Sequence, residues 1–160
     1  MKRITTVMAA TLLWSHAFAE PSLPIAKAED RVLLIDLCSM TVPGGKATLK
    51  IGPLRPRSDI YGGDYQMKVT PYFFKGESGK LAITVPREAF AKVSQGLTVG
   101  VTGTATTNDE SKVRHIDATA TPSNSDHGAL KLWFLAGDRM MVFNTSYHIV
   151  RTDSLPASSH

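Results

Sequence analysis

Cysteine is nearly absent from this sequence, whose 160 residues include a single cysteine, Cys38. One cysteine cannot form a disulfide within the chain, so an ordinary hydrophobic core must stabilise the fold. A chain of this length can bury such a core in one domain. Cys38 lies in the apolar run VLLIDLCSM, where a buried free cysteine behaves as a small hydrophobic residue. The alternative, a reactive thiol, needs a nearby base and a lowered pKa.

The strong sequence signatures of enzymes are also missing. The sequence contains no HExxH motif, no paired cysteines and no Cys-His spacing that indicates a zinc site. It contains no GxSxG nucleophile elbow and neither of the phosphate-binding motifs GxxxxGKS/T and GxGxxG. No cofactor is therefore predicted, and a non-enzymatic role is favoured.

Long apolar runs are confined to the N-terminus. The opening residues MKRITTVMAATLLWSHAFAE combine two basic residues, an apolar run from Ile4 to Trp14, and the small-x-small sequence Ala17-Phe18-Ala19. This order is typical of a secretory signal peptide, and the apolar run is shorter than the roughly 20 residues that span a bilayer. We predict that residues 1–19 are cleaved off, that no transmembrane segment remains, and that the protein works in the periplasm or outside the cell.

The sequence has little excess charge of either sign. It contains 18 Lys and Arg and 14 Asp and Glu residues, and two of the basic ones, Lys2 and Arg3, lie in the predicted signal peptide. The mature chain would have 16 basic and 14 acidic residues, a net charge of +2. Nucleic-acid-binding proteins show a clustered basic face and a larger excess, so no nucleic-acid partner is predicted.

Residues 31–150 show the alternation of a β domain. Apolar and polar side chains alternate around residues 47–51, 65–69, 81–85 and 97–101, which buries one face of an antiparallel sheet. We predict a mainly β single domain of about eight strands, folded as an antiparallel sandwich or partly closed barrel. Turn-forming sequences separate the runs: PGG (43–45), YGGD (61–64), GESG (76–79), TNDES (107–111) and AGDR (136–139).

One segment, VPREAFAKVSQG, has a helical pattern instead. Pro86 suits a first helical turn and Gly96 a C-terminal stop, while Ala89, Phe90 and Val93 form an apolar face at helical spacing. This predicts one short helix over residues 86–95. Outside the β domain, we expect an extended lead-in over residues 20–30 and a flexible tail over residues 151–160.

Two strands carry irregular features. Val113 and Ile116 have opposite parity on one predicted strand, and a β-bulge near Arg114 or His115 would reconcile them. In GVTGTATT, glycines inside a strand indicate a bend or a close approach of another backbone.

Candidate ligand-binding residues gather between residues 53 and 74. The loop PLRPRSD holds two arginines that could form a fork for an anion, and several tyrosines and phenylalanines follow it. Ligand pockets are mostly apolar with a few polar groups, although core packing and a solvated loop explain the same residues and are the preferred interpretation. The candidates are Arg55, Arg57, Tyr61, Tyr65 and Tyr72.

Weaker candidates for chemistry come from the histidines. His115 and Asp117 would share one face of a strand, and with His148 they would make a two-His-one-carboxylate set. In TPSNSDHGALKLWF, Asp126 and His127 are adjacent, but neighbouring side chains diverge in an extended chain and do not orient each other. The polar residues before Gly128 are typical of a hairpin loop.

The C-terminal half resembles a known group of proteins. The segment VTGTATTNDESKVRHIDATATPSNSDHGALKLWF, followed by MMVFNTSYHI, has a G-x-A strand, an ATP turn, HG-x-LK and a closing FNT-x-Y strand. In these short motifs it is similar to small exported bacterial proteins of unknown function. The resemblance covers about 50 residues, as the quoted segments show, and implies an exported β-rich domain without assigned catalytic residues.

These observations favour an exported, non-enzymatic β domain that binds a small apolar or anionic ligand or contacts an envelope protein. The alternative is a small hydrolase or metal-dependent enzyme that uses His115, Asp117, His127 or His148. It requires at least two of these side chains to converge in one concave site.

Overall fold

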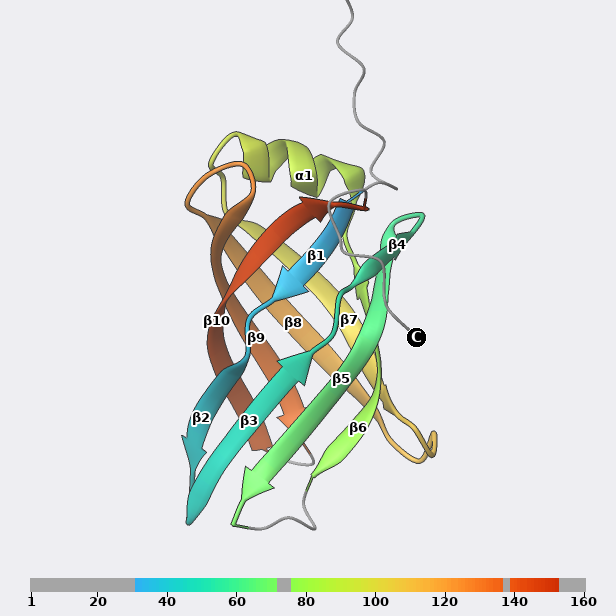
Figure 1. The fold of residues 1–160 in the computed structure, drawn as a ribbon, viewed down its shortest axis with the longest axis vertical. Coiled ribbons are helices and arrows are strands. Elements are labelled where there is room, and N and C mark those ends of the chain that lie inside the picture. The colour runs from blue at the N-terminus through green and yellow to red at the C-terminus, as the bar shows by residue number, and fades with distance from the viewer. Residues whose placement is uncertain (1–30, 72–75, 137–138, 153–160) are drawn as a thin grey trace, which may run out of the picture.

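The computed structural model describes residues 31–71, 76–136 and 139–152, which form a curled antiparallel sheet and one short helix (Figure 1). The expected mainly β domain and partly closed barrel are confirmed, with ten strands in the described ranges and a half-barrel shape. The elements are β1 (Arg31–Ile35), β2 (Cys38–Val42), β3 (Gly45–Ile51), β4 (Arg55–Arg57), β5 (Ile60–Thr70), β6 (Glu77–Thr84), α1 (Arg87–Ser94), β7 (Val99–Thr107), β8 (Val113–Pro122), β9 (His127–Ala136) and β10 (Arg139–Arg151).

The strand order explains the curl of the sheet. The strands follow one another as β1-β10-β9-β8-β7-β6-β5-β3-β2, and β4 pairs with β5 beside this path. Leu33 of β1 and Leu54, which precedes β4, exchange two backbone hydrogen bonds of 3.0 and 2.9 Å. This pair brings β1, the edge strand at one end of the sheet, against the connection between β3 and β4. β3 is next to the other edge strand, β2.

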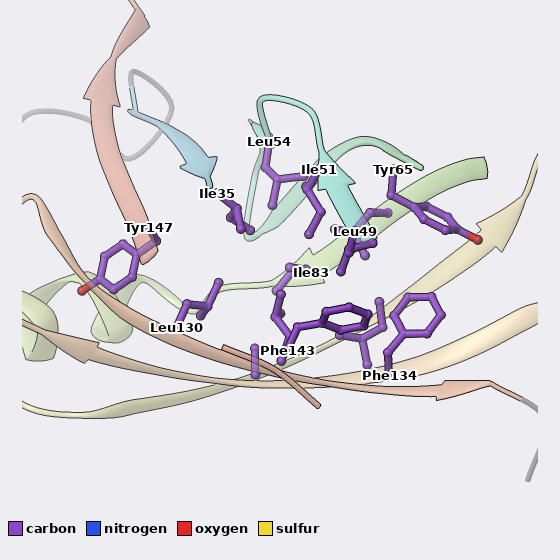
Figure 2. Packing of buried hydrophobic residues seen from close by; sticks show 14 of the residues in the cluster. Ile35, Leu49, Ile51, Leu54, Tyr65, Ile83, Leu130, Phe134, Phe143 and Tyr147 are labelled. Carbon is purple, nitrogen blue, oxygen red and sulfur yellow. The ribbon is translucent and has the colours of Figure 1, made fainter. Parts of the chain in front are cut away.

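The alternating residues fall on the two faces as expected. On β6, for example, Leu81 and Ile83 are buried while Lys80 and Thr84 are exposed. The inner faces of opposite walls supply one continuous core, part of which is drawn in Figure 2. A half-barrel therefore buries the apolar face of a single sheet against itself.

Helix α1 lies across one end of the half-barrel, where β10 ends and β1 begins (Figure 1). It occupies the predicted segment, and its buried face consists of Ala89, Phe90 and Val93. The helix stops at Gly96, which has a φ of +76° and donates its N–H to the Val93 carbonyl over 3.0 Å. This left-handed conformation suits glycine and ends a helix.

Two predicted turns are wrong. Three of the four residues of GESG, 77–79, lie in β6 and pair with β5. The YGGD sequence lies inside β5, which pairs continuously with β6 from Ile60 to Met67. A glycine is needed here for close packing, because a Cβ on Gly63 would lie 2.8 Å from a methyl of Leu54 and 2.9 Å from the Pro53 carbonyl oxygen. Gly63 therefore allows Pro53 and Leu54, the segment before β4, to pack closely against β5. It does not form a turn.

The predicted bulge near Arg114 is also wrong. β8 keeps an uninterrupted register with β7, from Val113 opposite Thr106 to Ala120 opposite Val99. Val113 and Ile116 point to opposite faces of the strand without a bulge. Val113 points outward with 69% of its surface accessible, and Ile116 is buried. Arg114 is consequently the residue that faces inward at the start of this strand.

The glycines of β7 offer a test of the tight packing. A Cβ on Gly103 would lie 2.4 Å from the Ala82 carbonyl oxygen, whereas a Cβ on Gly100 would have nothing within 4 Å. We expect Gly103→Ala to lower the free energy of unfolding by about 2 kcal/mol through overpacking. Gly100→Ala, the matched control on the same strand, should change it by less than about 1 kcal/mol. Urea unfolding of both variants measures the difference, and equal effects would contradict this packing.

Candidate functional site

The two arginines proposed as an anion fork lie on the outer surface. β4 places Arg55 and Arg57 on one face of a three-residue strand, and both are exposed. Pro56 between them is the register partner of the buried Tyr61. The two arginines therefore face away from the core. Tyr72, another candidate, lies outside the described residues.

Tyr61 and Tyr65 lie on the inner face of β5 and contact different parts of the core. The ring of Tyr61 is 5.7 Å from that of Phe90 on α1, and the ring of Tyr65 is 5.9 Å from that of Phe134. Burial raises the pKa of each tyrosine to about 12, so both hydroxyls are neutral at physiological pH. The structure thus brings Tyr61 beside the helix and Tyr65 toward the opposite end.

The end of the half-barrel opposite α1 contains an ion pair that the sequence pattern did not indicate. Arg114 donates to Glu77 through Nε at 2.8 Å and through Nη2 at 2.6 Å, and Tyr65 donates its hydroxyl to Glu77 at 3.3 Å. The two charged side chains are only 13% and 10% exposed. Arg114 also stacks over Phe134, with Cζ 5.9 Å from the ring centroid. These polar groups satisfy one another, so the cluster serves as a structural closure of this end.

An apolar cavity of about 60 Å³ lies beneath α1. Ala89, Phe90 and Val93 of the helix form one side of it, and residues of β1, β6, β7, β8, β9 and β10 form the wall. The described lining contains no charged side chain. Tyr147 is the one described lining residue with a polar side-chain group, but its hydroxyl does not face the cavity, whose surface is formed by apolar atoms.

Tyr147 occupies an unusual position in this lining. It is 4% exposed, its hydroxyl oxygen is buried, and this oxygen has no hydrogen-bond partner in the described part of the chain. The ring lies over Gly128, its register partner on β9, where an added Cβ would be 2.9 Å from the ring. Figure 2 shows the hydroxyls of Tyr147 and Tyr65 at opposite ends of the labelled cluster. The Tyr65 hydroxyl is bonded to Glu77, while that of Tyr147 has no partner.

The four candidate histidine and aspartate side chains form two separate pairs. On β8, His115 Nε2 is 3.1 Å from Asp117 Oδ1. His127 and His148 are register partners on β9 and β10, and their stacked rings have centroids 6.0 Å apart. Asp117 is opposite Trp133, which is six residues along β9 from His127. The strand rise puts about 20 Å between the pairs, so all four cannot take part in one reaction.

The His127–His148 pair has a carboxylate neighbour that the sequence analysis missed. Asp36, between β1 and β2, accepts a hydrogen bond of 2.5 Å from the Ser146 hydroxyl and lies 3.4 Å from His148 Nε2. The serine thus donates to the aspartate, whereas a nucleophilic serine donates to its histidine. The cluster is on the exposed outer surface and is not arranged as a catalytic triad.

Metal and thiol chemistry find no arranged site in the described part of the chain. No group of three or more His, Cys, Asp or Glu side chains there is placed to hold a metal ion. Cys38 is 6% exposed and donates its thiol to the Leu49 carbonyl at 3.6 Å. Burial raises the pKa of this thiol to about 11, so it stays protonated at neutral pH. Cys38 therefore behaves as a core residue.

The buried ion pair predicts a stability effect. Arg114→Met would leave Glu77 buried without its partner, and we expect it to lower the free energy of unfolding by about 3 kcal/mol. Lys80→Met breaks the exposed Lys80–Asp64 pair, whose side chains are 75% and 73% exposed, and provides the matched control. This control should change stability by less than about 1 kcal/mol. Equal denaturation midpoints for the two variants would refute a structural role for Arg114.

The cluster of Asp36, Ser146 and His148 on the outer surface predicts how the pKa of Asp36 depends on its neighbours. The hydrogen bond from Ser146 is the largest cause that lowers the pKa of Asp36, followed by the interactions with His148. A lowered folded-state pKa means that the carboxylate stabilises the fold above its unfolded pKa, and that this contribution is lost as the pH falls through the folded pKa. Ser146→Ala should raise the Asp36 pKa in a carbon-13 NMR titration. Thr145→Val removes a hydroxyl that donates to the backbone carbonyl of Asp36 and not to its carboxylate, so it should leave that pKa unchanged.

Comparison with known proteins places this chain in no family. No protein-family model, no curated protein and no solved structure gives a significant match. The resemblance of the C-terminal half to small exported bacterial proteins therefore stays a prediction. Among the described residues, no helix has both the length and the apolar character required to cross a bilayer.

Proposed function

We propose that this chain is an exported binding protein that holds a small, largely apolar molecule in the cavity beneath α1. The observation that carries the proposal is this apolar cavity, next to which the buried Tyr147 hydroxyl has no hydrogen-bond partner among the described residues. A ligand that reaches this hydroxyl with an oxygen or nitrogen acceptor would complete its hydrogen bond. The apolar lining would contact the rest of the ligand, as is typical of small-molecule sites.

The energetics of Tyr147 support this role. A buried hydroxyl without a partner destabilises a protein by about 1–3 kcal/mol, and a phenylalanine would fill nearly the same space without that penalty. Water is a poor partner here, because an ordered internal water needs two to four polar neighbours and the described lining presents none to the cavity. The hydroxyl is therefore unfavourable for the ligand-free fold and favourable for a complex.

The size of the cavity limits what the observed conformation admits. Its volume of about 60 Å³ is less than half of the roughly 150 Å³ that accommodates benzene in an engineered apolar cavity. A larger ligand must displace α1, which contacts the sheet through one face of two turns. Short connections on both sides, residues 85–86 and 95–98, join the helix to β6 and β7.

The cellular setting of the proposal comes from the sequence. Residues 1–19 have the three-part order of a signal peptide, and they lie outside the described residues. We propose that the mature protein works in the periplasm or outside the cell. A carrier in such a compartment would shield an apolar molecule from water.

Contact with an envelope protein is the second candidate. Val113, Leu135 and Met140 are exposed by 69%, 40% and 54%, and Leu135 and Met140 are register partners on the outer face. Such a small apolar group on the surface is compatible with a protein partner. The cavity is the better-supported site because it is lined by apolar surface beneath α1 and adjoins the Tyr147 hydroxyl, which is buried without a partner among the described residues.

Tyr147→Phe should separate stability from binding. Without ligand, we expect the variant to be more stable than the wild type by about 1 kcal/mol, because the unpartnered hydroxyl is gone. Tyr65→Phe is the matched control, since it removes a hydroxyl that is bonded to Glu77 and should lower stability. Urea unfolding of delipidated protein measures both changes.

The same variants test the ligand hydrogen bond. We expect NMR titration of cavity methyl groups to show that 2-butanone binds wild-type protein about threefold to tenfold more tightly than its oxygen-free analogue 2-methyl-1-butene. Tyr147→Phe should abolish this preference. The proposal fails if neither compound shifts the signals of cavity residues, or if the preference for the ketone survives the substitution.

A further inference from the structure

The inner faces of β1 and β10 form a ladder of register pairs that leads out of the cavity. From the inside outward, the pairs are Ile35–Tyr147, Leu33–Ile149 and Arg31–Arg151. The first two pairs line the cavity. Because alternate residues of a strand share a face, the two arginines follow on the same face at its rim.

This arginine pair is unfavourable by itself. Like charges placed directly opposite each other on neighbouring strands repel and destabilise a sheet. Five ion pairs are formed by the described residues, and neither Arg31 nor Arg151 takes part in any of them. The positive charge at the rim is therefore not neutralised by a carboxylate in the described part of the protein.

Arg31 lies close to the helix that covers the cavity. Its Cζ is 5.4 Å from the centroid of the Phe90 ring, and Phe90 forms part of the cavity lining. Its positive charge also reaches the Tyr61 hydroxyl, where it partly opposes the effect of burial on the pKa. The Arg31 guanidinium is thus held at the edge of the apolar space and not extended into solvent.

We propose that the ligand is a single-chain amphiphile whose anionic headgroup binds Arg31 and Arg151 while its apolar chain enters the cavity beneath α1. This inference rests on the proposed function and specifies the class of ligand: its chain is apolar apart from the acceptor atom proposed to meet Tyr147, and, being larger than the cavity of about 60 Å³, it must displace α1 to enter. Guanidinium groups match carboxylate and phosphate oxygens and can bind them through paired hydrogen bonds. An anion at the rim would relieve the repulsion between the arginines.

The interior of the cavity excludes the reverse orientation. A carboxylate placed among apolar side chains without a cation would lose its hydration and gain no ion pair, which is strongly unfavourable. The anionic end of a ligand must therefore remain at the rim, and the chain must be the part that passes inward along Leu33 and Ile149.

Other arginines at this end of the protein do not serve the same role. Arg87 is the first residue of α1, and its Nε lies 3.7 Å from Asp59 Oδ1. This carboxylate partly neutralises the charge of Arg87. Arg55 and Arg57 lie on the outer face of β4. Arg57 is therefore a suitable control, since it adds positive charge to the surface without facing the cavity.

The experiment compares headgroups on one chain length. Calorimetric titration of the mature protein with octanoate, octyl phosphate and 1-octanol should show the two anions binding about tenfold or more tightly than the alcohol. Arg31→Gln and Arg151→Gln should each remove most of this preference. Their affinity for 1-octanol should stay unchanged, which would show that the cavity is intact. Arg57→Gln should behave as the wild type.

Salt and membrane controls distinguish the source of the anion. Raising the salt concentration should weaken octanoate binding and leave 1-octanol binding unchanged, because only the former depends on exposed charge. If the arginines instead bind membrane headgroups, the protein would cosediment with phosphatidylglycerol vesicles in an Arg31- and Arg151-dependent manner and would show no preference for free octanoate. That result would overturn the inference.

The outcomes also separate this inference from the proposed function. Equal binding of octanoate and 1-octanol, with displacement of 2-butanone by both, would refute the anionic headgroup and leave the cavity as a binding site. Failure of all these compounds, including 2-butanone, to perturb the cavity would refute both.

Discussion

A single sheet has no second layer to cover its apolar face, so this chain must bury that face against itself. The curl is fixed where Leu33 and Leu54 exchange backbone hydrogen bonds and bring β1 against the segment before β4. Gly63 makes that approach possible, because a side chain there would collide with Leu54. Once the sheet has curled, its inner side chains form the core, and the two ends of the half-barrel become the places where that core must be closed.

The two ends are closed by different chemistry. At the start of β6, Arg114 and Glu77 form a nearly buried ion pair, and Tyr65 donates to the same carboxylate. At the other end, α1 covers the core with apolar side chains only, and the Tyr147 hydroxyl beneath it has no partner. The first arrangement is complete within the protein, whereas at the second end one hydroxyl and two rim charges have no partner among the described residues. This asymmetry favours the helix-covered end as the proposed ligand site.

Most of the fold follows from local patterns, and most of the site does not. Period-two alternation and the helical segment at residues 86–95 were sufficient to predict the sheet, its buried face and α1. Local parity failed at Val113, where an exposed valine suggested a bulge and concealed the inward position of Arg114. Asp36, Tyr147 and the Arg31–Arg151 pair acquire their neighbours from strands more than 100 residues apart in the chain. No spacing within one segment could indicate such contacts.

Stability alone does not account for the helix-covered end. Phenylalanine in place of Tyr147 would keep the packing over Gly128 and remove a buried hydroxyl without a partner. An acidic residue opposite Arg31 would replace repulsion with attraction. Both unfavourable features lie on the inner faces of the same two strands and are separated along each strand by one apolar pair, Leu33 and Ile149. A ligand with an anionic end would compensate the arginines, and an acceptor oxygen would compensate the tyrosine. Their shared location therefore supports the proposed binding site.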